Sequence, residues 1–256
     1  MFALITGSGF YDIPDLTDRE RRPVTTPYGS VELTVGRWHG HDVAFLPRHG
    51  ARHSIPPHAI DYRSNVWALR AAGAEAVVAT AVSGAIDPVL RPGQLVVVDD
   101  VIDFTSGRRS TFFDDETDPG FGTGPVVHTD MTHPYDPTLR ALVVRAAAEV
   151  GVPVVDGGVY CATNGPRFET PAEIRMMAAV GGHLVGMTGQ PEVTLAREAG
   201  LPYASIAVVS NPAAGLGAEE LSIDDIVAVI ETTAEPLYRL IGRTIALHAG
   251  HEVPEP

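Results

Sequence analysis

Three side chains that could bind an oxyanion stand close together in an otherwise acidic sequence. Arg48, His49 and His53 follow an apolar segment that ends at Leu46, while the chain has a formal net charge of −14 and all 18 of its basic residues are arginine. A guanidinium beside imidazoles suits phosphate, because it forms short charge-assisted hydrogen bonds to phosphate oxygens. A solvated basic loop is the alternative. The negative net charge argues against a nucleic-acid surface, which needs a basic stripe.

A glycine-rich turn after the first apolar segment could take part in the same chemistry. Residues 6–9 read Thr-Gly-Ser-Gly and follow the apolar residues 2–6. Glycines let backbone N–H groups approach a phosphate, and Ser8 can donate its hydroxyl. The alternatives are a plain tight turn or half of a dinucleotide-binding fingerprint. The full fingerprint is absent, because Asp12 occupies the position of its last glycine.

A second stiff turn places an aromatic ring beside a carboxylate. Residues 164–170 read Asn-Gly-Pro-Arg-Phe-Glu-Thr and precede a predicted helix. A flat heterocyclic base can stack on Phe168 while Glu169 accepts an N–H. Equally, Phe168 could lie in the core and Glu169 could cap the helix. The turn is therefore a candidate base site, with both readings open.

Further candidates lie at the ends of other apolar segments, each with a plain structural alternative. The small residues 81–85, beginning with Ala81, would let a ligand approach the backbone or would allow close packing. Met187 is more often a core residue than a ligand contact. Asn211 before a proline is more often a turn residue.

The elements that must position these residues alternate between short β-branched runs and longer alanine-rich segments. This alternation predicts an α/β fold: a single domain with a central mixed, twisted β-sheet flanked by helices, spanning residues 1–250 and followed by a disordered tail at 251–256. The predicted strands are residues 2–6, 31–35, 42–46, 76–81, 95–98, 158–162, 184–187 and 204–209. The predicted helices are residues 62–72, 137–150, 171–180, 191–199 and 222–248. Residues 105–129 lack periodicity and predict a long loop, functional or at an interface.

The composition indicates a cytoplasmic protein without a metal site. Cys161 is the one cysteine, which rules out an internal disulfide and a cysteine-based metal site and favours a reducing compartment. The first residues lack the features of a signal peptide. No apolar run reaches the roughly 18 residues that span a bilayer. The length fits one sizeable domain.

Taken in order, these motifs resemble the purine nucleoside phosphorylase and methylthioadenosine phosphorylase family over residues 5 to about 248. The order makes the resemblance specific, since no single motif would suffice. The motifs are Gly-Ser-Gly at 7–9, Thr-Pro-Tyr-Gly at 26–29, Arg-His-Gly at 48–50, Ala-Val-Ser-Gly at 81–84, Gly-Pro-Arg-Phe-Glu-Thr at 165–170, Gly-Met-Thr at 186–188 and Pro-Glu at 191–192.

The resemblance implies where the substrates bind. It implies a phosphate site from Ser8, Arg48, His49, His53, Ala81 and Thr188. It implies a ribose contact from Met187 and a base site from Phe168, Glu169, Asn211 and the neighbouring Ala213. His49, Glu169 and Asn211 would act in catalysis, with inorganic phosphate as co-substrate and no cofactor. It also implies homotrimers or dimers of trimers, in which a neighbour supplies His128 near the 5′ end of the substrate.

Two departures from the methylthioadenosine phosphorylase pattern indicate the base. Those enzymes usually have aspartate at the positions of Asn211 and Ala213, and a small hydroxyl residue at the position of Glu169. Hypoxanthine and guanine offer a donor at N1 and an acceptor at O6. An ionised carboxylate can only accept, and an asparagine can donate to O6 or N7, so this pair suits a 6-oxopurine. Mismatched buried polar pairs are worth several powers of ten in specificity.

The 5′ group is indicated by the start of the C-terminal helix. Ile223 and Val227 lie one helical turn apart, either in the core or, as the resemblance implies, at the mouth of a 5′ pocket. An apolar mouth would favour 5′-methylthioinosine, with inosine and guanosine left open. The alternatives are a methylthioadenosine phosphorylase, a nucleosidase that uses water and a non-catalytic nucleotide-binding module.

Overall fold

The fold is organised around β5 (Ala76–Ala85), a long strand without a charged residue. The computed structural model describes residues 1–10, 13–50, 54–114, 127–217 and 222–250. Within them β5 is parallel to β1 (Phe2–Thr6) on one edge and to β11 (Tyr203–Pro212) on the other. Beyond the end of β1, the same edge of β5 pairs antiparallel with β10 (Leu184–Gly186). The sheet therefore branches at β5.

The described residues form one mixed sheet of eleven strands, ordered β2-β3-β4-β1-β5-β10-β9-β7, with β11, β6 and β8 leading off from the other edge of β5. The remaining strands are β2 (Thr17–Thr26), β3 (Gly29–Trp38), β4 (His41–Pro47), β6 (Leu95–Val97), β7 (Asp100–Asp103), β8 (Val154–Asp156) and β9 (Val159–Ala162). The β2-β3 and β3-β4 pairs are antiparallel, and β4 is parallel to β1. The mixed sheet confirms the predicted fold class.

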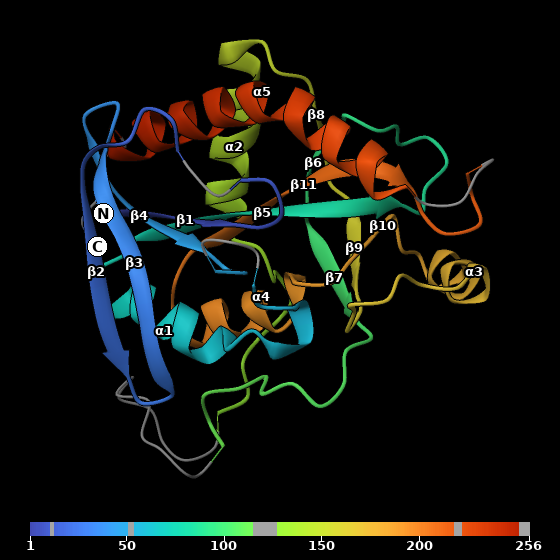
Figure 1. Ribbon diagram of the computed structural model, residues 1–256, viewed down its shortest axis with the longest axis horizontal. Helices are drawn as coiled ribbons and strands as arrows, with labels where there is room; N and C mark the ends of the chain where they lie inside the picture. Colours follow the sequence, from blue (N-terminus) through green and yellow to red (C-terminus); the bar gives the residue numbers. More distant parts are fainter. Residues whose placement is uncertain (11–12, 51–53, 115–126, 218–221, 251–256) are drawn as a thin grey trace.

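Helices cover both faces of this sheet. Figure 1 shows α1 (Tyr62–Ala71) and α4 (Gly189–Glu198) on one face and α2 (Pro137–Val150) and α5 (Ile223–Gly250) on the other. The strands supply both cores by alternation, because successive side chains point to opposite faces. Ala3 and Ile5 of β1 join the core under α1 and α4, while Phe2 and Leu4 join the core under α2 and α5.

The helix ends show why the predicted helices begin where they do. Asp136 caps α2 by accepting the Leu139 N–H at 2.7 Å, and α3 (Pro171–Ala179) begins with a capping box between Thr170 and Glu173. These caps satisfy N–H groups that have no partner within the helix. All five predicted helices are confirmed to within a few residues. None of the helices in the described residues is long and apolar enough to cross a membrane.

All eight predicted strands are present, and three further strands were not predicted. β2 consists mostly of exposed polar residues, contains Pro23 and lies at the sheet edge against β3 alone, so it carries no apolar signal. β7 and β8 are only four and three residues long. The predicted tail at 251–256 lies outside the described residues.

Candidate active site

A cavity of about 630 Å³ opens where several strands end at the same side of the sheet. Its wall includes the turn after β1, the residues after β4 and β10, and the last parts of β5 and β11. In α/β sheets the carboxyl ends of parallel strands are the usual place for ligands. The sequence motifs at these strand ends therefore converge on one space.

Arg48 lines this cavity, and its guanidinium is itself bound by a carboxylate. Its Nε donates to Glu192 Oε2 at 2.9 Å, and its Nη2 donates to Oε1 at 2.6 Å. Its Nη1 donates to the Thr80 carbonyl at 2.6 Å. The sequence predicted an oxyanion contact for Arg48, and three of its donors are held within the protein. A guanidinium has five N–H donors, so two of them are left for a ligand.

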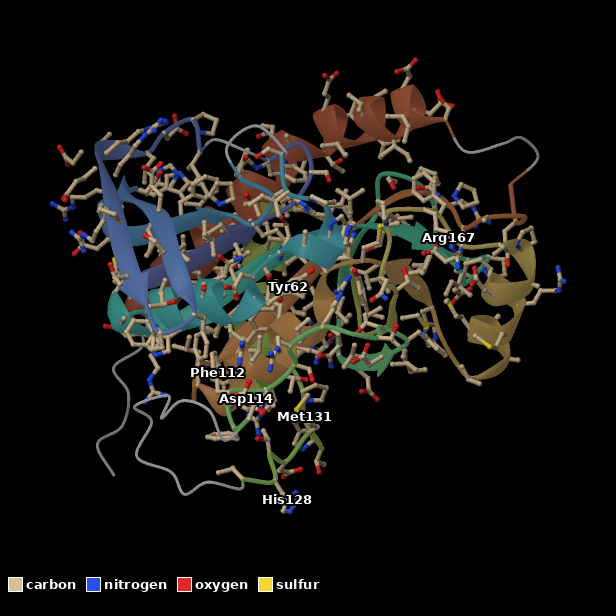
Figure 2. The ribbon with its side chains drawn as sticks, turned by 60° about the horizontal axis from the view of Figure 1, so that its bottom comes forward. Tyr62, Phe112, Asp114, His128, Met131 and Arg167 are labelled. Carbon is tan, nitrogen blue, oxygen red and sulfur yellow. The ribbon has the colours of Figure 1, made fainter. Side chains whose placement is uncertain are left out.

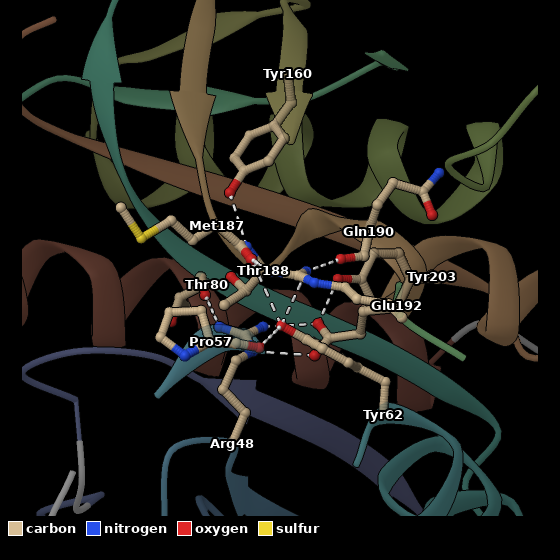
Figure 3. A network of polar contacts seen from close by, with 11 residues as sticks. Arg48, Pro57, Tyr62, Thr80, Tyr160, Met187, Thr188, Gln190, Glu192 and Tyr203 are labelled. Atoms are coloured by element: carbon tan, nitrogen blue, oxygen red, sulfur yellow. Dashed lines mark hydrogen bonds and ion pairs between the residues drawn. The ribbon is translucent and has the colours of Figure 1, made fainter. Parts of the chain in front are cut away.

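The ion pair between Arg48 and Glu192 is fully buried, with 2% of Arg48 and none of Glu192 exposed. Tyr203 adds a third bond, donating its hydroxyl to Glu192 Oε1 at 2.7 Å (Figure 3). Burial lowers the pKa of Arg48, but the adjacent Glu192 carboxylate more than offsets this and raises the pKa above its ordinary value. The arginine therefore stays charged and fixed in direction. Its Nη1 lies 3.0 Å from where a Cβ at Gly7 would sit, so glycine keeps that turn close to the guanidinium.

The other predicted oxyanion ligands divide into three groups. Ser8, His49 and Thr188 line the cavity with Arg48. The His49 Nδ1 lies 2.8 Å from the Ile55 carbonyl, and because a carbonyl only accepts, Nδ1 carries the hydrogen. The Ala81 side chain packs into the core under α1 and α4, and Ser83 and Gly84 form the wall from the same strand. His53 lies outside the described residues.

Phe168 and Glu169 line the same cavity. The Phe168 ring is 41% exposed, so it is not a core residue. Glu169 does not cap α3, because Thr170 and Glu173 form that cap. Its Oε1 accepts the Thr163 hydroxyl at 2.7 Å, which leaves Oε2 without a partner among the described residues. The carboxylate is thus held on one side and open to a ligand on the other.

Asn211 also lines the cavity, with its amide held in one orientation. Its Oδ1 accepts the Ser210 hydroxyl at 2.6 Å, and its Nδ2 donates to the Pro212 carbonyl at 2.7 Å. The carbonyl contact identifies the nitrogen, since two acceptors would repel each other. One N–H of the amide remains for a ligand. The cavity wall therefore combines an acceptor from Glu169 with a donor from Asn211.

The third part of the wall is apolar. Ile223 and Val227 of α5 line the cavity and are 59% and 45% exposed, so neither packs into the core. Met187 and the buried Ala213 also line it. His128 is not part of the cavity wall of its own chain, and Figure 2 shows it at the lower edge of the molecule, apart from Arg167. Among the described residues, no group of His, Cys, Asp or Glu side chains could hold a metal ion.

Three residues that shape the site were not singled out as such from the sequence. Glu192 was noted only as part of a Pro-Glu motif, and its burial in α4 is what makes it a partner for Arg48. Thr163 orients Glu169 through its hydroxyl. Tyr203 begins β11, one residue before the strand predicted at 204–209. Of these three residues, only Glu192 leaves a signal in the sequence, as a charged residue within a predicted helix.

Comparisons with known proteins agree over nearly the whole chain. The family model described as the phosphorylase superfamily matches residues 1–246. A probable 6-oxopurine nucleoside phosphorylase from Moorella thermoacetica is 48% identical, over 95% of this chain and 91% of that protein. The 6-oxopurine nucleoside phosphorylase of Pyrococcus furiosus is 45% identical, over 96% and 92%. A probable S-methyl-5′-thioinosine phosphorylase from Methanothermobacter thermautotrophicus is 43% identical, over 96% and 83%.

A solved structure extends the agreement to three dimensions. The methylthioadenosine phosphorylase from Schistosoma mansoni, in complex with adenine, superposes with a TM-score of 0.89 at 32% identity. The match covers 98% of this chain and 92% of the other. The cavity described above therefore belongs to a fold shared along the whole chain.

The buried ion pair yields a stability prediction. Replacing Glu192 with alanine leaves the Arg48 guanidinium buried without its counter-charge, so we expect unfolding free energy to fall by about 3–5 kcal/mol. Urea unfolding followed by circular dichroism measures this change. Glu235→Ala, which breaks an exposed ion pair with Arg239, should change little. Equal effects of the two substitutions would contradict the role given to Glu192.

Proposed function

This chain belongs to the phosphorylase superfamily, and from that premise we propose that it is a purine nucleoside phosphorylase that cleaves 6-oxopurine nucleosides with inorganic phosphate. The observation that carries the proposal is the pairing, in one cavity, of a cationic end at Arg48 with an acceptor and a donor at Glu169 and Asn211. The relatives named as 6-oxopurine and methylthioinosine phosphorylases support the same substrate class.

Phosphate would bind at the Arg48 end of the cavity. The two free N–H donors of the guanidinium, the Ser8 hydroxyl and the backbone of the Gly7 turn all border this space. Thr188, which comes just before α4, lines the same space. His49, with its Nδ1 hydrogen on Ile55, adds its ring to the same wall.

The bond between C1′ and N9 of the nucleoside would break ahead of phosphate attack, which gives the sugar oxocarbenium character. Phosphate on the opposite face then forms the new C1′–O bond, and its negative charge stabilises the cationic sugar. Holding phosphate and nucleoside in one cavity also supplies effective concentration. The products are the free purine and a ribose 1-phosphate.

The leaving purine gains negative charge, and the base end of the cavity is built to hold it. Asn211 would donate its remaining N–H to N7 or O6, and Glu169 would accept N1–H through Oε2. Phe168 offers its ring face for stacking. Adenine presents an acceptor at N1, so it would place two acceptors together at Glu169.

The apolar wall favours a methylthio group at the 5′ position. Ile223 and Val227 present exposed hydrocarbon to the cavity, and Ile226 lies between them on the same helix. A 5′-hydroxyl buried there without a partner costs about 1–3 kcal/mol. We therefore propose 5′-methylthioinosine as the preferred substrate, with inosine and guanosine as the alternatives.

We also propose that the protein assembles into an oligomer and acts in the cytoplasm. Because His128 lies outside the cavity of its own chain, it could reach a substrate only across a subunit boundary, as in a homotrimer or a dimer of trimers. The reaction needs neither metal nor organic cofactor. The single Cys161, which is buried and free, suits the reducing conditions of the cytoplasm.

The base assignment predicts the behaviour of Asn211→Asp. An aspartate would set a carboxylate oxygen against the Pro212 carbonyl and remove the donor to the base. We expect kcat/KM for inosine-type substrates to fall about 10²-fold or more, with a smaller loss on adenosine-type substrates. The ratio of kcat/KM for inosine-type to adenosine-type substrates, measured on one sample, does not depend on the fraction of folded protein. A wild-type enzyme that cleaves methylthioadenosine as well as methylthioinosine would refute the assignment.

The apolar wall predicts that 5′-methylthioinosine has a kcat/KM at least about tenfold above that of inosine. Ile223→His introduces a polar ring beside the 5′ position and should shrink or invert this preference. Ala228→His places the same ring on α5 outside the cavity wall and should leave the preference unchanged. Equal values for the two substrates in the wild-type enzyme would show that the wall does not select the 5′ group.

A further inference from the structure

Arg108 lies outside the cavity wall, yet its side chain reaches the backbone of two of the segments that contribute to it. It belongs to residues 105–114, the described beginning of the long loop at 105–129 that the sequence predicted to be functional or at an interface. The outer part of this segment is firmly attached. The Phe112 ring is fully buried, and the Phe112 backbone N–H donates to Glu198 Oε2 at 2.7 Å. Asp114 pairs with Arg63 at 2.5 Å (Figure 2).

The guanidinium of Arg108 binds backbone carbonyls from two separate parts of the chain. Its Nη2 donates to Thr163 O at 3.2 Å and to Asn164 O at 2.9 Å, both after β9. The same nitrogen donates to Met187 O at 2.9 Å, after β10, and Nη1 donates to Gln190 O. Nη2 has only two hydrogens for these three carbonyls, so one hydrogen is shared between two of them in a three-centre bond.

Tyr62 completes this contact from α1. Arg108 Nη1 donates to the Tyr62 hydroxyl at 3.3 Å, and the guanidinium carbon lies 5.3 Å from the centre of the tyrosine ring. Burial raises the pKa of Tyr62 above its ordinary value, so the hydroxyl keeps its hydrogen and donates to the Pro57 carbonyl at 3.0 Å. Pro57 lines the cavity near His49.

The carbonyls bound by Arg108 belong to the two segments that carry or support residues of the proposed reaction. Thr163 orients Glu169 through its hydroxyl, and Asn164 begins the turn that carries Phe168. Met187 precedes Thr188 at the phosphate end. Gln190 lies just before Glu192, which fixes Arg48 (Figure 3). One side chain thus joins the base end of the cavity to the phosphate end.

We propose that Arg108 is a positioning residue that sets the distance between the base-binding loop at 163–169 and the phosphate-binding loop at 187–190. The inference rests on the proposed function. A flat guanidinium is suited to this task, because its rigid fork places several donors in one plane, whereas lysine offers a single compact ammonium. Displacing reacting groups by about 1 Å can cost about 10²-fold in rate.

The test compares Arg108→Ala and Arg108→Lys with Arg109→Ala. Arg109 is the matched control, since its side chain is 66% exposed and contacts only Asp114 among the described residues, at 3.3 Å. We expect Arg108→Ala to lower kcat/KM about 10²-fold and to raise KM for both nucleoside and phosphate. The ratio of inosine-type to adenosine-type activity should fall, because Glu169 loses its fixed orientation. Arg108→Lys should recover only part of the loss, and Arg109→Ala should match the wild type.

Two readouts separate positioning from general stability. Millimolar guanidinium ion should restore activity to Arg108→Ala and leave Arg109→Ala unchanged. A merely structural role would reduce the folded fraction, so kcat per mole of protein would fall while both KM values and the substrate ratio stayed at wild-type values. That pattern would overturn the proposal.

A third readout does not depend on activity. Amide hydrogen exchange followed by mass spectrometry should show faster exchange at residues 163–170 and 187–190 in Arg108→Ala, and wild-type exchange there in Arg109→Ala. Unchanged exchange at these residues in Arg108→Ala would refute the proposal that Arg108 holds the two loops together. If the wild-type protein shows no phosphorolysis, the proposed function fails, and hydrogen exchange still decides whether Arg108 joins the two loops.

Discussion

An ionised carboxylate cannot leave water without a partner, and Glu192 has no exposed surface. Its pairing with Arg48 therefore constrains the fold as much as the site. The pair draws together the end of β4, the middle of β5 through Thr80, the first turn of α4 and Tyr203 of β11. Because three of its donors are bound in this way, the guanidinium has one orientation, with Nη1 toward the glycine turn after β1.

The same principle governs the proposed base-binding part of the cavity. Glu169 and Asn211 each use part of their hydrogen-bonding capacity on neighbours, through Thr163, Ser210 and Pro212. What remains is one acceptor direction and one donor direction, fixed before any ligand arrives. Preset directions of this kind discriminate between bases, since a mismatched base would leave a buried polar group unpaired.

The sequence predicted the parts of the molecule that carry an apolar or glycine-rich pattern. It identified the strands that reach the site and most of the cavity wall, because chemistry-bearing residues follow those strands directly. It missed β2, whose side chains are mostly polar and exposed, and it did not predict the ion pair between Arg48 and Glu192. Arg108 could not be found in this way, since its partners are backbone carbonyls and carry no residue signature.

The requirement for phosphate tests the account most directly. Hypoxanthine release from 5′-methylthioinosine can be followed with the wild-type protein in phosphate-free buffer and at increasing phosphate, with the sugar product identified by mass spectrometry. The geometry at Arg48 predicts release that saturates with phosphate and yields the sugar 1-phosphate alone. Release at the same rate without phosphate, with the free sugar as product, would contradict it.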